Sequence, residues 1–76
     1  MGWKIDGESM SCFAERLKEL RVERGLSQAQ LAKEVGVSSV AIVYWESKQR
    51  IPNLDSVIDL AKFFNVSLDY IAGLED

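Results

Sequence analysis

The sequence predicts an all-α fold of five helices. Apolar residues recur at the three- and four-residue spacing of amphipathic helices, and good helix caps or glycines separate these stretches. Strand-like alternation lasts no more than a few residues, apart from an ambiguous run over 40–45 that helix caps bracket too closely to favour a sheet. A chain of 76 residues is expected to fold around a single core.

The chain is expected to divide into a short lead-in and one helical domain. Residues 1–10 follow neither period, so we expect a loosely ordered N-terminal segment there and the folded domain over 11–76. The first helix is expected over 11–24. Its apolar residues at helical spacing are Phe13, Leu17 and Leu20.

Caps define the second and third helices. Ser27 and Gln30 have the spacing of a capping box, in which the serine oxygen accepts the glutamine amide, so a helix opens directly after the serine. Gly36 ends this helix, because glycine enters the left-handed backbone conformation without steric cost. Ser38 then caps a short third helix over 39–46.

The last two helices also begin at polar caps. Asn53 precedes an apolar stripe typical of a fourth helix, and Ser67 caps a short fifth helix that ends at Gly73. The apolar members of the two helices are Leu54, Val57, Ile58, Ala61 and Phe64, then Leu68, Tyr70 and Ile71.

The second and third helices have the pattern of a helix-turn-helix. Two helices joined by so short a turn cross steeply, which requires a small residue at their contact, a glycine at the turn and apolar residues underneath. These requirements are met, in order, by Ala32, Gly36 and the pair Ile42 and Trp45. In such a motif the second helix projects from the body and can enter the major groove of DNA.

The motif belongs to a longer resemblance. The runs FAERLKELRVERGLSQAQLAKEVGVSS and IVYWESKQRIPNLDSVIDLAKFFNVSLDYIAGLED carry five elements in register: RLKELR before a glycine, LSQ-x-x-LA, Gly-Val-Ser, I-x-x-WE and LAKFFNVSLDYI. Over about residues 12–74 the sequence therefore resembles the phage repressor and Cro family of helix-turn-helix DNA-binding transcriptional regulators. The resemblance implies a compact five-helix bundle of the lambda-repressor type, prokaryotic or phage origin, and sequence-specific binding of double-stranded DNA, as a repressor.

The resemblance also implies roles for three polar residues. Gln28, in the first turn of the second helix, is expected to bind a DNA phosphate, the alternative being a solvated side chain. Arg21 and Glu46 are expected to form a partly buried ion pair that ties the first helix to the end of the third. The alternative is two surface charges, and such a pair fixes geometry more than it adds stability.

The third helix departs from the polar pattern usual in that family. Its outward positions are expected to include Val40, Val43 and Tyr44, and apolar side chains clustered on an exposed turn usually form an interaction surface. Valines would contact thymine methyl groups, and Tyr44 a phosphate or a base-edge methyl, which favours an A·T-containing half-site. The expected DNA-binding residues are Gln28, Ser38, Ser39, Val40, Val43, Tyr44, Lys48, Gln49 and Arg50.

Charge is distributed unevenly along the chain. The formal net charge of −3 argues at first against a nucleic-acid partner, because such partners usually meet a basic surface. Residues 1–27 are neutral overall, 28–53 carry +1 and 54–76 carry −4, so the acidity lies away from the expected DNA-binding helix. Because positive charge is sparse there, a single chain is expected to bind DNA weakly.

Weak binding by one chain predicts a homodimer on a palindromic operator. Two-fold pairing would place two third helices one DNA turn apart, roughly 34 Å, and would couple their binding energies. The resemblance implies dimerisation through the last helix, with Tyr70, Ile71 and Leu74 as apolar contacts. The alternative role of these three residues is packing in the chain's own core.

Other classes of function are disfavoured. With no histidine to activate the single cysteine, Cys12, and no grouped acid, base and nucleophile, we expect no enzyme activity, catalytic residue, metal site or cofactor. No small-molecule site, signal peptide or membrane span is evident, so a cytoplasmic location is expected. Two alternatives stay open. One is an antitoxin that binds both DNA and a toxin, and the other is a protein-interaction module whose partner would compete for the face of the third helix that bears Val40, Val43 and Tyr44.

Overall fold

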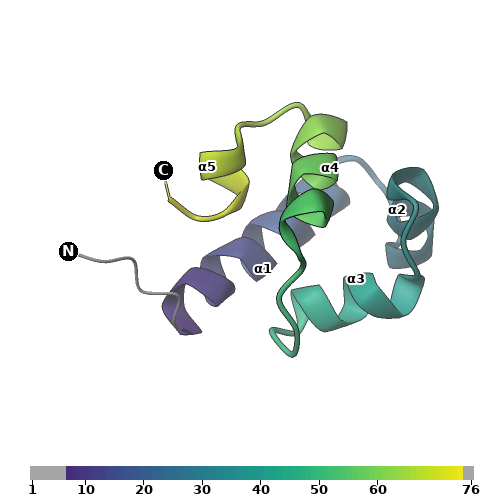
Figure 1. Cartoon of the computed structure of the whole chain (residues 1–76). Coiled ribbons are helices and arrows are strands. Elements are labelled where there is room, and N and C mark those ends of the chain that lie inside the picture. The colour runs from purple at the N-terminus through teal and green to yellow at the C-terminus, as the bar shows by residue number, and fades with distance from the viewer. Residues whose placement is uncertain (1–6, 75–76) are drawn as a thin grey trace.

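A computed structural model describes residues 7–74 as five helices around one core (Figure 1). The helices are α1 (Gly7–Glu23), α2 (Gln28–Val35), α3 (Ser39–Glu46), α4 (Leu54–Phe64) and α5 (Leu68–Ile71). The expected all-α fold is confirmed, since this part of the chain contains no strand. Among the same residues, no helix is long and apolar enough to cross a membrane.

The start of α1 differs from the sequence-based expectation. The helix begins at Gly7 instead of Ser11, so the expected loose lead-in is wrong for residues 7–10, whereas 1–6 lie outside the described residues. This first turn has no apolar periodicity to reveal it, and helices extend readily from a packed body because each added residue gains a backbone hydrogen bond. Cys12, half-buried, therefore lies in the second turn of α1 instead of at its N-terminus.

Side-chain caps set the starts of the other four helices. Hydroxyl or amide oxygens of the caps accept the backbone N–H three residues later at distances of 2.9 to 3.1 Å; the caps are Ser27, Ser38, Asn53 and Ser67. The Ser27 N–H also donates to the Gln30 side chain at 2.8 Å, which completes the capping box. The predicted starts of α2, α3 and α4 are therefore confirmed, because each depends on a local hydrogen bond.

The centre of the core takes one fully buried side chain from each helix. These side chains are Leu17, Leu31, Ile42, Leu60 and Ile71. Phe13, Trp45 and Phe64 extend the same cluster, which joins all five helices. Since no helix has a core of its own, the domain is expected to unfold as one cooperative unit.

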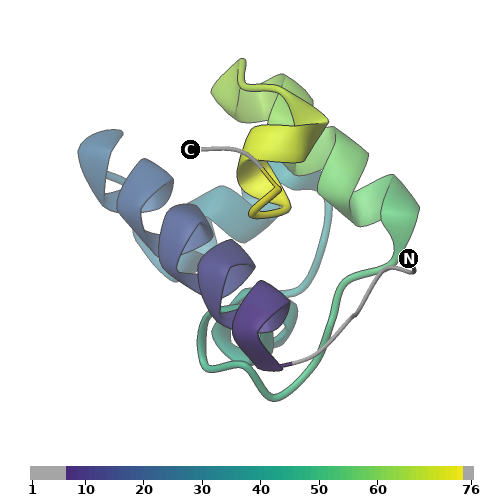
Figure 2. The ribbon, with the colours of Figure 1, turned by 90° about the vertical axis from the view of Figure 1, so that its left-hand side faces the viewer.

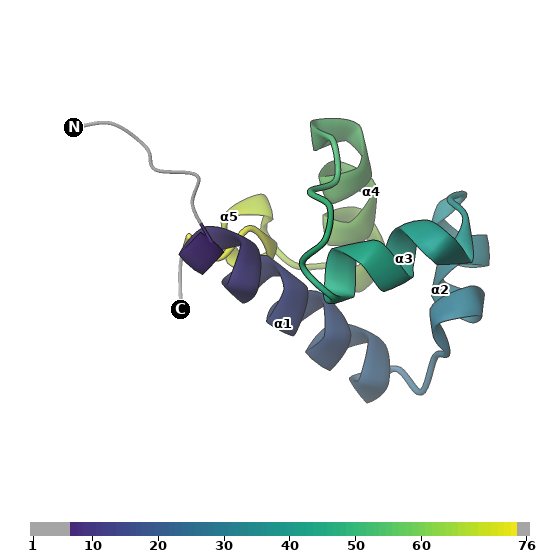
Figure 3. The ribbon, with the colours of Figure 1, turned by 90° about the horizontal axis from the view of Figure 1, so that it is seen from below.

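The turn between α2 and α3 presents α3 at the surface. Gly36 has a φ of 77°, in the left-handed region, and the N–H of Val37 donates to the Ala32 carbonyl at 3.0 Å. In Figure 1 the resulting helix, α3, runs along the lower edge of the fold, while α5 lies near the top. The view from below in Figure 3 shows α3 crossing the near side of the fold. One long side of α3 is thus open to solvent.

Candidate nucleic-acid interface

The outer side of α3 is apolar and exposed. Val40 and Val43 are 55% and 40% exposed, and Tyr44 beside them is half-buried. Ile42 and Trp45, on the opposite side of the helix, belong to the core. The period of the α-helix explains this division, because residues three and four apart share a face. The two valines lie about one helical turn apart on the same exposed side, so they form an apolar surface that a partner could cover.

The two serines at the start of α3 have different surroundings. The Ser38 hydroxyl accepts the Ala41 N–H at 3.1 Å, so this oxygen already serves as the helix cap. Ser39 is exposed in the first turn of α3. Only Ser39 therefore presents a hydroxyl with no role in holding the helix, and DNA binding by either serine stays a prediction.

The loop after α3 folds back over the end of that helix. The Gln49 N–H donates to the Tyr44 carbonyl at 2.9 Å. This brings Arg50 over the tyrosine, with its guanidinium carbon 5.3 Å from the centre of the Tyr44 ring. A cation at this distance from an aromatic face is attracted to it. The exposed side chains of Lys48, Gln49 and Arg50 are thus gathered at the C-terminal end of α3.

Lys48 holds an unfavourable backbone conformation. Its φ is 67°, in the left-handed region, where any residue with a Cβ is strained and glycine is usual. Strain of this kind is often found where a side chain has a function. The long cationic side chain of Lys48 therefore stands where a glycine would be more stable, beside the exposed face of α3.

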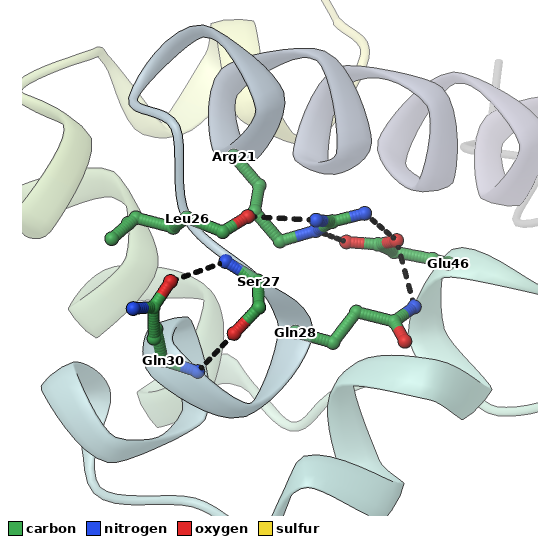
Figure 4. A network of polar contacts seen from close by, with 6 residues as sticks. All are labelled: Arg21, Leu26, Ser27, Gln28, Gln30 and Glu46. Carbon is green, nitrogen blue, oxygen red and sulfur yellow. Dashed lines mark hydrogen bonds and ion pairs between the residues drawn. The ribbon is translucent and has the colours of Figure 1, made fainter.

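A polar network joins α1, α2 and α3 (Figure 4). Arg21 Nε and Nη2 donate to Glu46 Oε2 and Oε1 at 2.7 and 3.0 Å, and Arg21 Nη1 donates to the Leu26 carbonyl at 2.9 Å. The side chains of Arg21 and Glu46 are only 12% and 5% exposed, so the ion pair is largely shielded from water. The network fixes the end of α3 against α1.

Glu46 also changes the protonation equilibrium of its partner. Its hydrogen bonds and charge raise the pKa of the Arg21 guanidinium, and they outweigh the burial that acts in the opposite direction. A cation whose pKa is raised by folding stabilises the folded protein while it is protonated. This contribution is present at neutral pH and is lost only in strong alkali. The Arg21 guanidinium therefore stays charged through the neutral range.

Gln28 is bound to this network. Its Nε2 donates to Glu46 Oε1 at 3.1 Å, which holds the half-buried side chain at the N-terminus of α2. A side-chain amide carries two hydrogens, so one donor is left for a phosphate at this helix end. The expected phosphate contact is compatible with the network but stays a prediction.

The cleft beside Gln28 adds a residue that the sequence reasoning missed. Lys18 lines this open cleft together with Gln28 and Val43, so a cation of α1 lies near the N-terminus of α2 and the exposed face of α3. The sequence feature that could have identified Lys18 is its spacing, because it precedes Arg21 by about one helical turn and lies on the same face of the helix.

The residues expected in the dimer interface do not share one surface. Ile71 is fully buried in the core, so its assignment to the interface is corrected: its side chain is already covered by the chain's own helices. Tyr70 is half-buried, with the Arg16 guanidinium carbon 4.4 Å from its ring centre. Leu74 is exposed, and its contact with a second chain stays a prediction.

Comparison with known proteins finds close relatives of this chain. A helix-turn-helix family model matches residues 17–71. The chain is 41% identical over 64 residues to the HTH-type transcriptional activator BcrR of Enterococcus faecalis, covering 84% of this chain and 31% of that protein. It is 40% identical over 59 residues to the repressor protein C2 of Salmonella phage P22, covering 78% of this chain and 27% of that protein. The chain thus spans less than a third of either relative.

A solved structure matches the fold as well. The crystal structure of the P22 c2 repressor protein in complex with synthetic operator 9T in the presence of Tl⁺ superposes with a TM-score of 0.78 at 36% identity. The match covers 83% of this chain and 96% of that one. The family model matches residues 17–71, and the helices are arranged as in this solved relative. The chain therefore belongs to the helix-turn-helix family.

Proposed function

We propose that the chain binds double-stranded DNA sequence-specifically and regulates transcription, as a homodimer that occupies a palindromic operator. The observation that carries this proposal is the exposed apolar face of α3 on a helix-turn-helix frame. Relatives named as a transcriptional activator and a phage repressor support it, as does the solved relative bound to an operator. Repression is the proposed outcome, through occupancy of the operator in the cytoplasm of a bacterium or phage host.

The proposed base contacts come from the middle of α3. Val40 and Val43 would pack against thymine methyl groups in the major groove, and Ser39 would hydrogen-bond to a base edge or a phosphate. Tyr44, with the Arg50 guanidinium against its ring, would contact the neighbouring base pair or phosphate. These contacts contain few bidentate hydrogen bonds, so selectivity would depend on methyl groups and groove shape more than is usual for Arg- or Gln-bearing helices.

The proposed phosphate contacts lie on both sides of α3. Lys48, Gln49 and Arg50 would meet the backbone at the C-terminal end of the helix, while Gln28 and Lys18 would meet it beside the N-terminus of α2. Three cations per chain would give about six neutralised phosphates per dimer. The logarithm of affinity is then expected to fall with the logarithm of salt concentration at a slope of roughly −5.

Selection of bound duplexes from a random pool tests this proposal. An enriched palindrome containing A·T pairs is expected, with the salt slope given above. Val40→Ala should change which bases are preferred, whereas Lys48→Ala should weaken all duplexes about equally. The matched control is Val22→Ala, which truncates an exposed valine of α1 and should change neither. If no sequence is enriched, or affinity does not depend on salt, the chain does not act in this way.

A further inference from the structure

The outer side of α3 offers no side chain that reads a purine by paired hydrogen bonds. The eight residues of α3, all of them described, are SVAIVYWE, so the helix has no arginine, lysine, asparagine or glutamine for the edge of a purine. Two of the polar groups at its end are already engaged. The Ser47 hydroxyl donates to the Tyr44 carbonyl at 3.3 Å, and the Glu46 carboxylate accepts from Arg21 at 2.7 Å. What this helix can present to a major groove is therefore mainly apolar.

Val40 and Val43, which we call the valine pair, each border an open hollow that is also lined by a cation. Val40 borders one hollow together with Arg50, and Val43 borders another together with Lys18. Figure 2 shows the loop that joins α3 to α4 at the lower edge of the fold, away from α5, in yellow, near the top. The valine pair thus has cations beside it, as a surface requires when it enters a groove bounded by phosphates.

The spacing of the valine pair fits neighbouring base pairs. Three residues of an α-helix rise about 4.5 Å, and successive base pairs of duplex DNA are about 3.4 Å apart. Valine has no donor or acceptor, so it cannot bond to the oxygens and nitrogens that distinguish one base pair from another. The group on a base edge that gains from contact with valine is the apolar C5 methyl. Thymine carries this methyl group, and 5-methylcytosine carries it on the same carbon of the ring.

We propose that the valine pair reads the C5 methyl group of a pyrimidine and not the base that carries it, so that methylation of cytosine in the operator strengthens binding. The proposal rests on the proposed function and names a DNA modification that regulates it. Enclosing one methyl group strengthens binding about fourfold, equal to about 0.8 kcal/mol. A palindrome presents the same position twice, so methylation of both half-sites strengthens binding by the homodimer roughly 15-fold. An operator with a C·G pair under the valine pair is therefore occupied at a lower protein concentration when it is methylated.

Four duplexes separate the methyl group from the base. Replacing each thymine of the operator selected from the random pool by uracil, in both half-sites together, identifies the thymines whose methyl groups contribute to binding. At these positions T·A, U·A, C·G and 5-methylcytosine·G are then compared by fluorescence anisotropy at one salt concentration. Comparing T·A with U·A, and methylated with unmethylated C·G, holds the base pair constant and changes only one methyl group per half-site. Loss of the thymine methyl and gain of the cytosine methyl should each change affinity roughly 15-fold, in opposite directions.

Truncation of the valines tests which residues read the methyl groups. Val40→Ala and Val43→Ala should each lower the ratio of methylated to unmethylated affinity at one position, to below about threefold, because less apolar surface covers the methyl group. Both variants should still bind the uracil duplex, which shows that they are folded. The matched control, Val22→Ala at an exposed valine of α1, should leave the ratio unchanged.

Three results would overturn the proposal. A cytosine methyl that changes affinity by less than about twofold, while the thymine methyl has its full effect, would show that the base itself is read. Uracil tolerated at every position, or a full methyl ratio in both alanine variants, would show that the valine pair reads no methyl group. In each case, specific binding of the thymine operator would still support the proposed function, so the two failures are distinct. A chain that enriches no duplex at all fails both.

Discussion

The pair of Arg21 and Glu46 offers a quantitative test of how α3 is held in place. Glu46 accepts three hydrogen bonds, two from Arg21 and one from Gln28, at 2.7 to 3.1 Å. Because both charged side chains are nearly buried, replacing one of them leaves the other unpaired and away from water. We expect Arg21→Met or Glu46→Met to lower the free energy of unfolding by about 3 kcal/mol, the usual cost of breaking a shielded pair.

Replacing both residues should cost much less than the two single changes together. The double variant contains no unpaired charge, and methionine fills irregular space with apolar contacts. The coupling energy between the two positions should therefore be at least about 2 kcal/mol. A domain of this size has a total stability on the order of 4 to 11 kcal/mol, so each single variant loses a large share of it. The melting temperature of each single variant should therefore be roughly 12 to 24 °C lower than that of the unmodified chain.

Urea unfolding of the four proteins, followed by far-ultraviolet circular dichroism, measures this coupling. The control is Glu34→Met, which changes an exposed residue of α2 and should shift stability by less than about 0.5 kcal/mol. A coupling energy below about 0.5 kcal/mol, as found for solvent-exposed pairs, would refute the reasoning. The two charges would then be held too loosely to fix α3 against α1.

Three further substitutions test local features. Lys48→Gly should relieve the left-handed strain and raise the free energy of unfolding by about 0.5 to 1 kcal/mol while weakening DNA binding; a protein that loses stability in urea titration would contradict this. Gly36→Ala should cost about 1 kcal/mol by the same measurement, because a Cβ there meets no atom within 4 Å and only the φ of 77° opposes it; a loss above about 3 kcal/mol would indicate an unrecognised clash. Arg50→Met should broaden the preference at the base pair next to Tyr44 in duplex selection, since the ring loses its cationic neighbour, and an unchanged motif would show that the contact at 5.3 Å does not orient it.

Local signals account for the parts of the fold that were predicted correctly. The starts of α2 and α3 depend on Ser27 and Ser38, whose oxygens bond to amides only three residues away. The start of α1 at Gly7 was missed, because no cap or apolar spacing marks it. A helix end set by extension from a packed body leaves no pattern in the sequence.

Without the family resemblance, which implied the pair of Arg21 and Glu46, the candidate site was predictable only where one helix decides the outcome. The outward positions of Val40 and Val43 follow from the period of α3 alone. The burial of Ile71 could not be read in the same way, because a four-residue helix such as α5 has no clear apolar face and its packing depends on the other helices. The same holds for Lys18, which joins the cleft because the shared core and the pair of Arg21 and Glu46 bring α1 against α3.

The acidity of the chain and its proposed DNA binding are reconciled by where the charges lie. Residues 54–76 carry −4 and include α4 and α5, while 28–53 carry +1 and include α2, α3 and the loop after α3. Binding as the proposed homodimer would double the number of cations that reach one DNA molecule, which a chain with so few of them requires. A domain whose acidic groups lie mostly outside the proposed DNA-binding segment can thus be acidic overall and still bind a polyanion.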